Sequence, residues 1–137
     1  MCCAAGLAVL ATLEEEGLQA KALATGARFV AAVEALAKTP HGQLIGQVRG
    51  CGLFLGIEFV RDRATLEPAS AETSVIVSRM KDEHCILMSV DGPSDSVLVM
   101  KPPMVFGFAD ADRTVACLEQ VLKTLGDVDP NAARTPT

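Results

Sequence analysis

The sequence of 137 residues lacks tryptophan and tyrosine and has only five phenylalanines. It also lacks an excess of positive charge, because 12 lysines and arginines stand against 17 aspartates and glutamates, for a formal net charge of −5. Proteins that bind nucleic acid neutralise phosphates with a basic surface. The charge balance therefore predicts no nucleic-acid partner.

Long hydrophobic runs are also missing. The longest, Cys2 to Ala11, is about half of the roughly 18 residues that span a bilayer. No basic segment precedes this run, and the three glutamates at residues 14–16 follow it. A secretory signal or a transmembrane helix would show different flanks. We therefore expect no membrane partner.

Metal-ligand spacing is absent as well. The five cysteines include no Cys-x-x-Cys pair, and the only histidines are His41 and His84, which excludes the common zinc patterns. An odd number of cysteines fits a reducing compartment, in which we expect buried thiols that act as small hydrophobic side chains. The sequence thus predicts an intracellular protein without distinguishing mitochondria from cytoplasm.

What the chain does have is apolar residues. They make up 50% of the sequence, against 21% charged residues, and the mean hydropathy is +0.33. This composition excludes disorder over most of the length, and the length fits one domain. A domain of this size buries only about two-thirds of its unfolded surface by itself. The surplus apolar residues suggest that another surface covers part of it.

The first segment, residues 2–16, is rich in alanine and leucine and predicts a helix. Its first part is apolar on every side, whereas the surface helix of an independent domain has one apolar stripe and one polar face. We therefore expect it to pack both against its own domain and against polypeptide outside this chain. Gly17 ends the helix, so we take residues 1–17 as a helix that leads into the domain.

The remaining elements follow from periodicity. Leu53, Leu55, Ile57 and Phe59 alternate with other residues as in a strand, and Gly50 to Gly52 forms either a tight turn or a bulge. We expect helices at 18–38, at 70–84 and from Asp110 or Asp112 to 125, and strands at 44–49, 53–60, 85–90 and 96–101. The stripe expected to face the core in the 18–38 helix is Leu23, Ala27, Val30, Val33 and Ala37.

This order of elements predicts an α+β fold. We expect a mostly antiparallel sheet of three to four strands, with helices packed on one face and the long N-terminal helix in front. The domain would span residues 18–126. The polar residues 127–137 would form a disordered tail.

No complete active site can be assembled from the sequence. The glycines do not follow the Gly-x-Gly-x-x-Gly order, and no serine lies in a Gly-x-Ser-x-Gly turn. We therefore name no catalytic, cofactor-binding or metal-binding residue. Lys101 stands apart from the other lysines because it ends a strand and precedes two prolines. It is either an ordinary edge-strand lysine or a cation that faces a ligand.

Four segments together resemble a known family. CAAGLAVLATLEEEGL, IGQVRGCGLFLGIEFVRD, SVDGP and VLVMKPPMVF stand in the order found in the C-terminal small domain of class III aminotransferases. The resemblance covers residues 2 to about 125. Within the family, SVDGP with KPPM is most similar to the phospho-lyase branch, which includes ethanolamine-phosphate phospho-lyase and 5-phosphohydroxylysine phospho-lyase.

The resemblance implies a fold-type I enzyme that uses pyridoxal phosphate and is normally a homodimer. In this family a large domain carries the lysine that binds the cofactor, and that domain has no counterpart here. None of the five lysines stands in the context of the cofactor lysine. We therefore expect pyridoxal phosphate in the parent enzyme and none on this chain alone. The implied partners are the missing large domain and a second subunit.

Three positions of the family pattern can be compared with this chain, and two of them concern the substrate. Many relatives place an arginine three residues before the double proline to hold an α-carboxylate, and phospho-lyases tend to have lysine there. This chain has Val99 at that position, which cannot hold a carboxylate. Lys101 matches the lysine before the prolines and is the candidate cation of the substrate cleft. Arg49 matches an arginine of the glycine-rich motif, for which we expect a structural role.

Two hypotheses follow. In the first, the chain is the small-domain portion of an aminotransferase or phospho-lyase that acts on a primary amine, such as a phosphorylated amino alcohol, and it is inactive alone. The alternative is a stand-alone, non-catalytic α+β module for binding or interaction.

Overall fold

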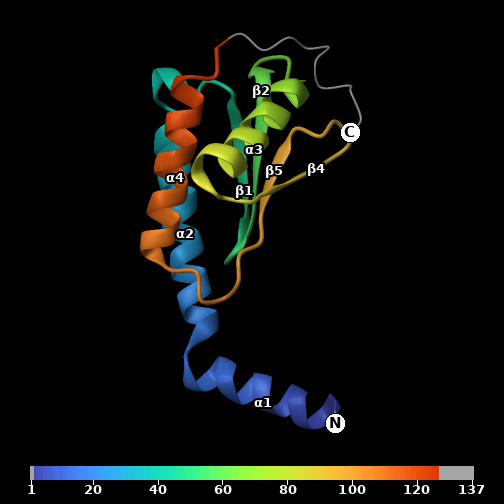
Figure 1. The fold of residues 1–137 in the computed structure, drawn as a ribbon, viewed down its shortest axis with the longest axis vertical. Helices are drawn as coiled ribbons and strands as arrows, with labels where there is room; N and C mark the ends of the chain where they lie inside the picture. The colour runs from blue at the N-terminus through green and yellow to red at the C-terminus, as the bar shows by residue number, and fades with distance from the viewer. Residues whose placement is uncertain (1, 127–137) are drawn as a thin grey trace.

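The computed structural model describes residues 2–126 (Figure 1). The tail expected at 127–137 lies outside the described residues. The helices are α1 (Cys2–Glu15), α2 (Leu18–Leu36), the 3-10 turn η1 (Pro40–Gly42), α3 (Ser70–His84) and α4 (Phe108–Lys123). The strands are β1 (Ile45–Cys51), β2 (Phe54–Asp62), β3 (Glu67–Pro68), β4 (Ser89–Asp91) and β5 (Val97–Met100).

The strands form one antiparallel sheet in the order β1-β2-β5-β4, and the two-residue β3 pairs with β2. Helices α2, α3 and α4 gather on one side of this sheet (Figure 1). The α+β class, the antiparallel pairing and the one-sided helices are therefore confirmed. The sheet has five strands instead of the expected three to four, because β3 adds a short strand.

The core lies between that face and the three helices. Leu55, Ile57 and Phe59 alternate along β2 and are each at most 2% exposed, because successive strand residues point to opposite faces. They pack with buried residues of all three helices: Phe29 and Val33 of α2, Ile76 and Met80 of α3, and Leu118 and Val121 of α4.

The stripe expected to face the core in α2 was wrong in part: Val33 is buried and Val30 and Ala37 are partly buried against the core, but Leu23 and Ala27 are exposed. The buried residues of this helix are Leu18, Thr25, Gly26, Phe29, Val33 and Leu36. Of the expected stripe only Val33 is fully buried, and Leu23 is 55% exposed. Phe29, the largest side chain of the helix, selects the face that packs on the sheet. The side of α2 that carries Leu23 and Ala27 is left toward solvent.

The structure shows which of the two predicted conformations, a tight turn or a bulge, the residues from Gly50 to Gly52 adopt. Cys51 pairs with Phe54, so only Gly52 and Leu53 connect the strands, and the connection is a tight turn. Gly50 and Gly52 both have positive φ, 135° and 56°, a region that favours glycine. The irregularity in the β1–β2 pairing lies elsewhere, between Ile45 and Gln47.

One helix boundary and one strand boundary differ from expectation, each for a physical reason. Helix α4 begins at Phe108, because the Asp110 carboxylate accepts a hydrogen bond from the Gly107 backbone N–H (2.9 Å) from inside the first turn. Strand β4 begins at Ser89 and not at residue 85. Cys85 adopts φ 57°, and the Ile86 N–H donates back to the Met80 carbonyl (3.0 Å), so residues 85 and 86 terminate helix α3 and do not begin a strand.

The cysteines correct another expectation. All five are free, but Cys2, Cys3, Cys51 and Cys85 are exposed and Cys117 is only partly buried. The four exposed cysteines are therefore not core residues, and Cys117 packs against the core only from its edge. Among residues 2–126, no group of three or more histidine, cysteine, aspartate or glutamate side chains is placed to hold a metal ion. No helix in the same residues is long and apolar enough to cross a membrane.

One ion pair joins the sheet to α3 in a partly buried place. Arg61 of β2 donates two hydrogen bonds to the Glu72 carboxylate, at 2.7 and 3.1 Å, and Glu72 is only 9% exposed. We expect Arg61→Met to destabilise the fold by about 2–4 kcal/mol, because it leaves a buried carboxylate without its partner. Urea denaturation measures this loss, and the double variant R61M/E72M should recover at least half of it.

The matched control is Lys81→Met, which breaks an exposed pair with Asp82. It should change the free energy of unfolding by less than about 0.5 kcal/mol. Equal effects of the two substitutions would show that burial of Glu72 does not matter.

A second ion pair links α2 to α4. Arg28 donates to both Asp112 carboxylate oxygens at 2.8 and 2.7 Å, and its guanidinium also lies 5.5 Å from the centre of the Phe108 ring. The hydrogen bond from Arg28 holds the pKa of Asp112 below its ordinary value of 3.8. The stability from this lowered pKa is present above the ordinary value and is lost as the pH falls through the lowered one.

We therefore expect the wild type to be more stable than Arg28→Gln at pH 7, and the difference to shrink as the pH falls below about 5. The contact with Phe108 does not titrate and leaves a constant offset. Thermal unfolding of both proteins across this pH range measures the difference. A difference that stays constant down to pH 3 would contradict the assigned role of Asp112.

Candidate functional site

The face of the sheet away from the helices carries the residues singled out in the sequence. The strand register places Arg49, Gly56, Val99 and Ser89 in one row across β1, β2, β5 and β4. Gly56 has no side chain, so the row is hollow at its centre. Arg49 closes one end of this hollow and Val99 the other.

Arg49 already forms polar contacts with its neighbours in the sheet. Its guanidinium donates to Gln47 of its own strand at 3.0 Å and forms an ion pair with Glu58 of β2. The pair ties β1 to β2 across the open face. Arg49 therefore offers less uncompensated charge to a ligand than its position suggests.

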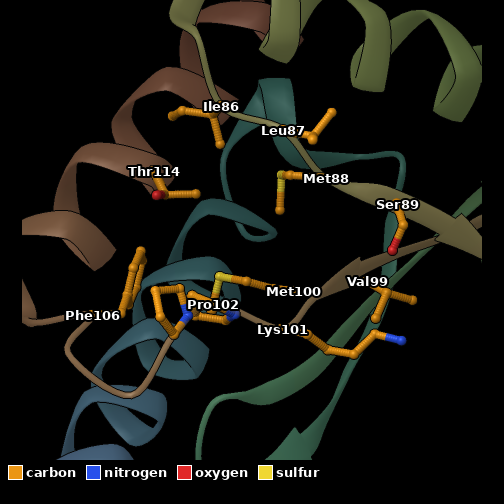
Figure 2. A pocket seen from close by; sticks show the side chains of 11 residues that line it. Ile86, Leu87, Met88, Ser89, Val99, Met100, Lys101, Pro102, Phe106 and Thr114 are labelled. Carbon is orange, nitrogen blue, oxygen red and sulfur yellow. The ribbon is translucent and has the colours of Figure 1, made fainter.

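A pocket of about 620 Å³, here called the central pocket, lies at the end of β5 (Figure 2). Its lining is mostly apolar: Ile86, Leu87, Met88, Val99, Met100, Pro102, Pro103 and Phe106, with Ser89, Lys101 and Thr114 as the polar members. The segment after α3, the end of β5 and the proline loop supply nearly all of these residues. A pocket of this size and character is typical of a small-molecule site.

Lys101 follows the last residue of β5 and lines this pocket. In Figure 2 its side chain runs toward Val99 and away from Phe106. The ammonium lies 5.4 Å from the centre of the Phe54 ring, which is a cation–π distance. Among residues 2–126, Lys101 forms no ion pair with an acidic side chain.

A second pocket of about 400 Å³, here called the sheet-face pocket, lies over Gly56. Phe54 and Arg49 line it, and Val99 lines both pockets. Val99 therefore stands at the junction of the two pockets, beside the Lys101 ammonium. Phe54 was not predicted as a site residue from the sequence. The sequence feature that could have identified it is a large aromatic side chain on the outward-facing side of an alternating strand.

The described residues do not fit pyridoxal phosphate on their own. The lysine that binds this cofactor must be deprotonated to form a Schiff base. Burial or a neighbouring cation lowers the pKa of a lysine and so promotes the loss of its proton. The five lysines, at positions 21, 38, 81, 101 and 123, are all exposed. The glycine-rich stretch of this chain forms the β1–β2 turn and not a loop before a helix, where a phosphate would bind.

Helix α1 forms the other unusual surface. It has no buried residue, and Leu7, Val9 and Leu10 are 69%, 59% and 59% exposed. Figure 1 shows it projecting from the body, in contact only around its junction with α2. Residues 2–13 contain no charged side chain, so the exposed surface is apolar on all sides.

Comparison with known protein families identifies the family of this chain. The family model described as aminotransferase class-III matches residues 1–122. The chain belongs to the class III aminotransferase family. The resemblance expected from the four sequence segments is thereby confirmed.

Class III relatives include both aminotransferases and phospho-lyases. The chain is 42% identical over 125 residues to an alanine–glyoxylate aminotransferase 2-like protein of Drosophila melanogaster, covering 88% of this chain and 25% of the relative. It is 34% identical over 120 residues to ethanolamine-phosphate phospho-lyase homolog 1 of Caenorhabditis elegans, with 88% and 25% covered.

A solved structure gives the same picture. A phospholyase from Arthrobacter in complex with phosphoethanolamine superposes with a TM-score of 0.80 at 40% identity, over 88% of this chain and 28% of that one. This class III chain therefore spans about a quarter of the length of the curated relatives it matches.

Proposed function

We propose that this chain is the C-terminal small-domain portion of a pyridoxal-phosphate enzyme, an aminotransferase or phospho-lyase that acts on a primary amine such as a phosphorylated amino alcohol. One observation carries the proposal: a family match over residues 1–122 that accounts for only about a quarter of each relative. The remaining polypeptide would supply the cofactor lysine.

Three features of the described residues support this division of labour. The lysines are all exposed, which does not favour a Schiff base with any of them. Helix α1 presents an apolar surface that its own domain does not cover. Lys101 and Val99 line a pocket that is open on one side, as expected of half of a cleft. We propose that a large domain and a second subunit complete the site.

The proposed enzyme works in a reducing compartment. All five cysteines are free, and four of them are exposed, where an oxidising environment would favour disulfides or mixed disulfides. This supports an intracellular location and does not separate mitochondria from cytoplasm.

The alternative, a stand-alone binding module, draws support from the enclosed core between the sheet and helices α2 to α4. Such a core can fold without a second polypeptide. The two proposals differ over α1, because a stand-alone module gains nothing from an uncovered apolar helix.

Cofactor trapping tests the proposed function. The isolated chain would be mixed with equimolar pyridoxal phosphate, reduced with borohydride and mapped by peptide mass spectrometry. We expect sparse labelling spread over the exposed lysines and no turnover of phosphoethanolamine or alanine. Stoichiometric labelling of one lysine, or turnover, would show that the chain carries its own cofactor site and would overturn the proposal.

A further inference from the structure

Strand β1 leaves one edge of the sheet unpaired. It pairs with β2 on one side, and within residues 2–126 no other backbone segment hydrogen-bonds to its other side. In an antiparallel pair, every second residue turns its N–H and C=O away from the partner strand. Proteins commonly keep such edges very short, as in the three-residue β4, whereas β1 has seven residues. The outer edge of β1 is therefore a template for a further strand.

Helix α2 runs beside this edge and forms a groove with it. Two adjoining hollows, of about 560 and 430 Å³, lie between the helix and the strand and share Glu34. The first lies beside the start of β1 and the second beside its end and the turn to β2. Together they are here called the edge groove. On the helix side, its lining includes Leu23, Ala27, Val30, Ala31, Glu34 and Lys38.

The edge groove contains the apolar side of α2 that the core does not use. Leu23, Ala27, Val30 and Ala31 recur at spacings of three or four residues, so they form a stripe along one side of the helix. Helix α2 packs on one face of the sheet, and a strand added to β1 would direct every second side chain toward that face. Those side chains would cover the stripe.

The two ends of the edge groove differ in charge. Lys38 and Arg63 line the end beside the start of β1, and neither forms an ion pair within residues 2–126. Arg63 donates to the Ala37 and Gly42 carbonyl oxygens, both at 2.8 Å, which fixes the guanidinium in place without an acidic partner. Apart from Glu34 at the junction, the other end has no charged lining residue.

We propose that the edge groove binds an extended segment of a different polypeptide, which adds a strand antiparallel to β1. Apolar side chains in the N-terminal half of the segment lie on the stripe of α2, and acidic residues at its C-terminal end pair with Lys38 and Arg63. The antiparallel direction follows the other pairs of this sheet and places that acidic end beside the two cations. Main-chain bonds to β1 hold the segment, and the stripe and the cations select its sequence.

A second copy of β1 is a poorer occupant of the edge groove. The charged residue of β1 is Arg49, so a second copy would bring positive charge and no carboxylate to a groove that carries Lys38 and Arg63. Like charges placed together disfavour such a partner. The edge groove shares no lining residue with the central pocket, so this proposal does not rest on the proposed function.

Binding of a synthetic peptide tests this proposal. The full chain would carry Leu7→Glu and Leu10→Glu to prevent association through α1, and the labelled peptide, as long as β1, would alternate valine with threonine and end in two glutamates. Fluorescence anisotropy measures the affinity, and hydrogen exchange locates the peptide. We expect saturable binding with slower exchange of β1 amides. A peptide that ends in two glutamines should bind about threefold to tenfold more weakly, and the reversed sequence should also bind more weakly.

Methylation of alternate backbone nitrogens in the peptide tests the added strand itself. In a paired strand, one alternate set of N–H groups faces β1 and the other faces solvent. Methyl groups on the first set should abolish binding, and methyl groups on the second set should leave most of it. Loss of binding with both sets, or with neither, would overturn the proposal.

Two alanine variants separate the edge groove from helix surfaces in general. Ala27→Glu places a charge on the apolar stripe and should weaken binding about tenfold or more. Ala116→Glu, the same change at an exposed position of α4, should change the affinity less than about twofold. Equal effects of the two variants, or a peptide that does not bind, would contradict the proposal. Concentration-dependent protection of β1 amides in the free chain would place a second copy in the groove and also overturn it.

Discussion

Replacing Gly26 with alanine is expected to destabilise the domain by about 3 kcal/mol or more, a large share of the 5–15 kcal/mol typical of small domains. A Cβ atom at this position would lie 1.9 Å from the Gly52 carbonyl oxygen and 2.6 Å from its carbon. Both are backbone atoms, so no side chain can rotate away. The gain in helix propensity, about 1 kcal/mol, does not offset the clash.

The clash cannot be relieved locally because both partners are fixed. Gly52 has φ 56° in the two-residue turn between β1 and β2. Gly26 lies one turn before Phe29, which is 1% exposed in the core. Moving either the turn or the helix therefore disturbs the packing of the sheet.

Urea denaturation measures the effect, with Gly6→Ala as the matched control. Gly6 lies in the exposed helix α1, and a methyl group added there would meet no other atom within 4 Å. Its substitution should leave the unfolding of the domain unchanged. If Gly26→Ala unfolds within about 0.5 kcal/mol of the wild type, the close contact between α2 and the turn is not present in solution.

The second large effect concerns self-association of the isolated chain. Helix α1 exposes Leu7 and Leu10 and has no charged residue before Glu14, and burying one leucine side chain contributes about 1.5–3 kcal/mol. We expect the wild type to form oligomers and to bind a hydrophobic dye such as ANS. The double variant Leu7→Glu, Leu10→Glu should be monomeric, with dye fluorescence reduced severalfold.

Light scattering coupled to size-exclusion chromatography reports the mass. The matched control, Ser74→Glu with Ser78→Glu, adds the same charge to the exposed side of α3 and should leave the oligomers intact. Both variants should keep the melting temperature of the core, because α1 has no buried residue. A wild type that is monomeric and does not bind dye would contradict the role assigned to α1.

Strand β2 was the most predictable part of the fold. The alternation of Leu55, Ile57 and Phe59 identifies β2 and its buried face without reference to any other element. Helix α2 shows where such patterns fail. It carries two apolar faces, one with Phe29 and one with Leu23, and periodicity does not say which of them meets the sheet. The sheet selects the face with Phe29, and Gly26 permits its close approach to the turn.

The candidate site was predictable only in part. The position of Lys101 at the end of a strand could be read from the two prolines that follow. Its contact with Phe54 could not, because it depends on the register that pairs Leu55 with Met100 across two strands far apart in sequence. The junction of the two pockets at Val99 depends on the same register. Composition did indicate the uncovered apolar surface, although not the exposure of the cysteines.

Hydrogen exchange of α1 tests the central claim most directly. The chain would be measured alone and together with the complementary three quarters of the Drosophila relative, produced as a separate polypeptide. If α1 is half of an interface, its amides should exchange freely in the isolated chain and at least about tenfold more slowly in the mixture. Unchanged exchange in α1, with the added polypeptide folded and holding pyridoxal phosphate, would contradict the account.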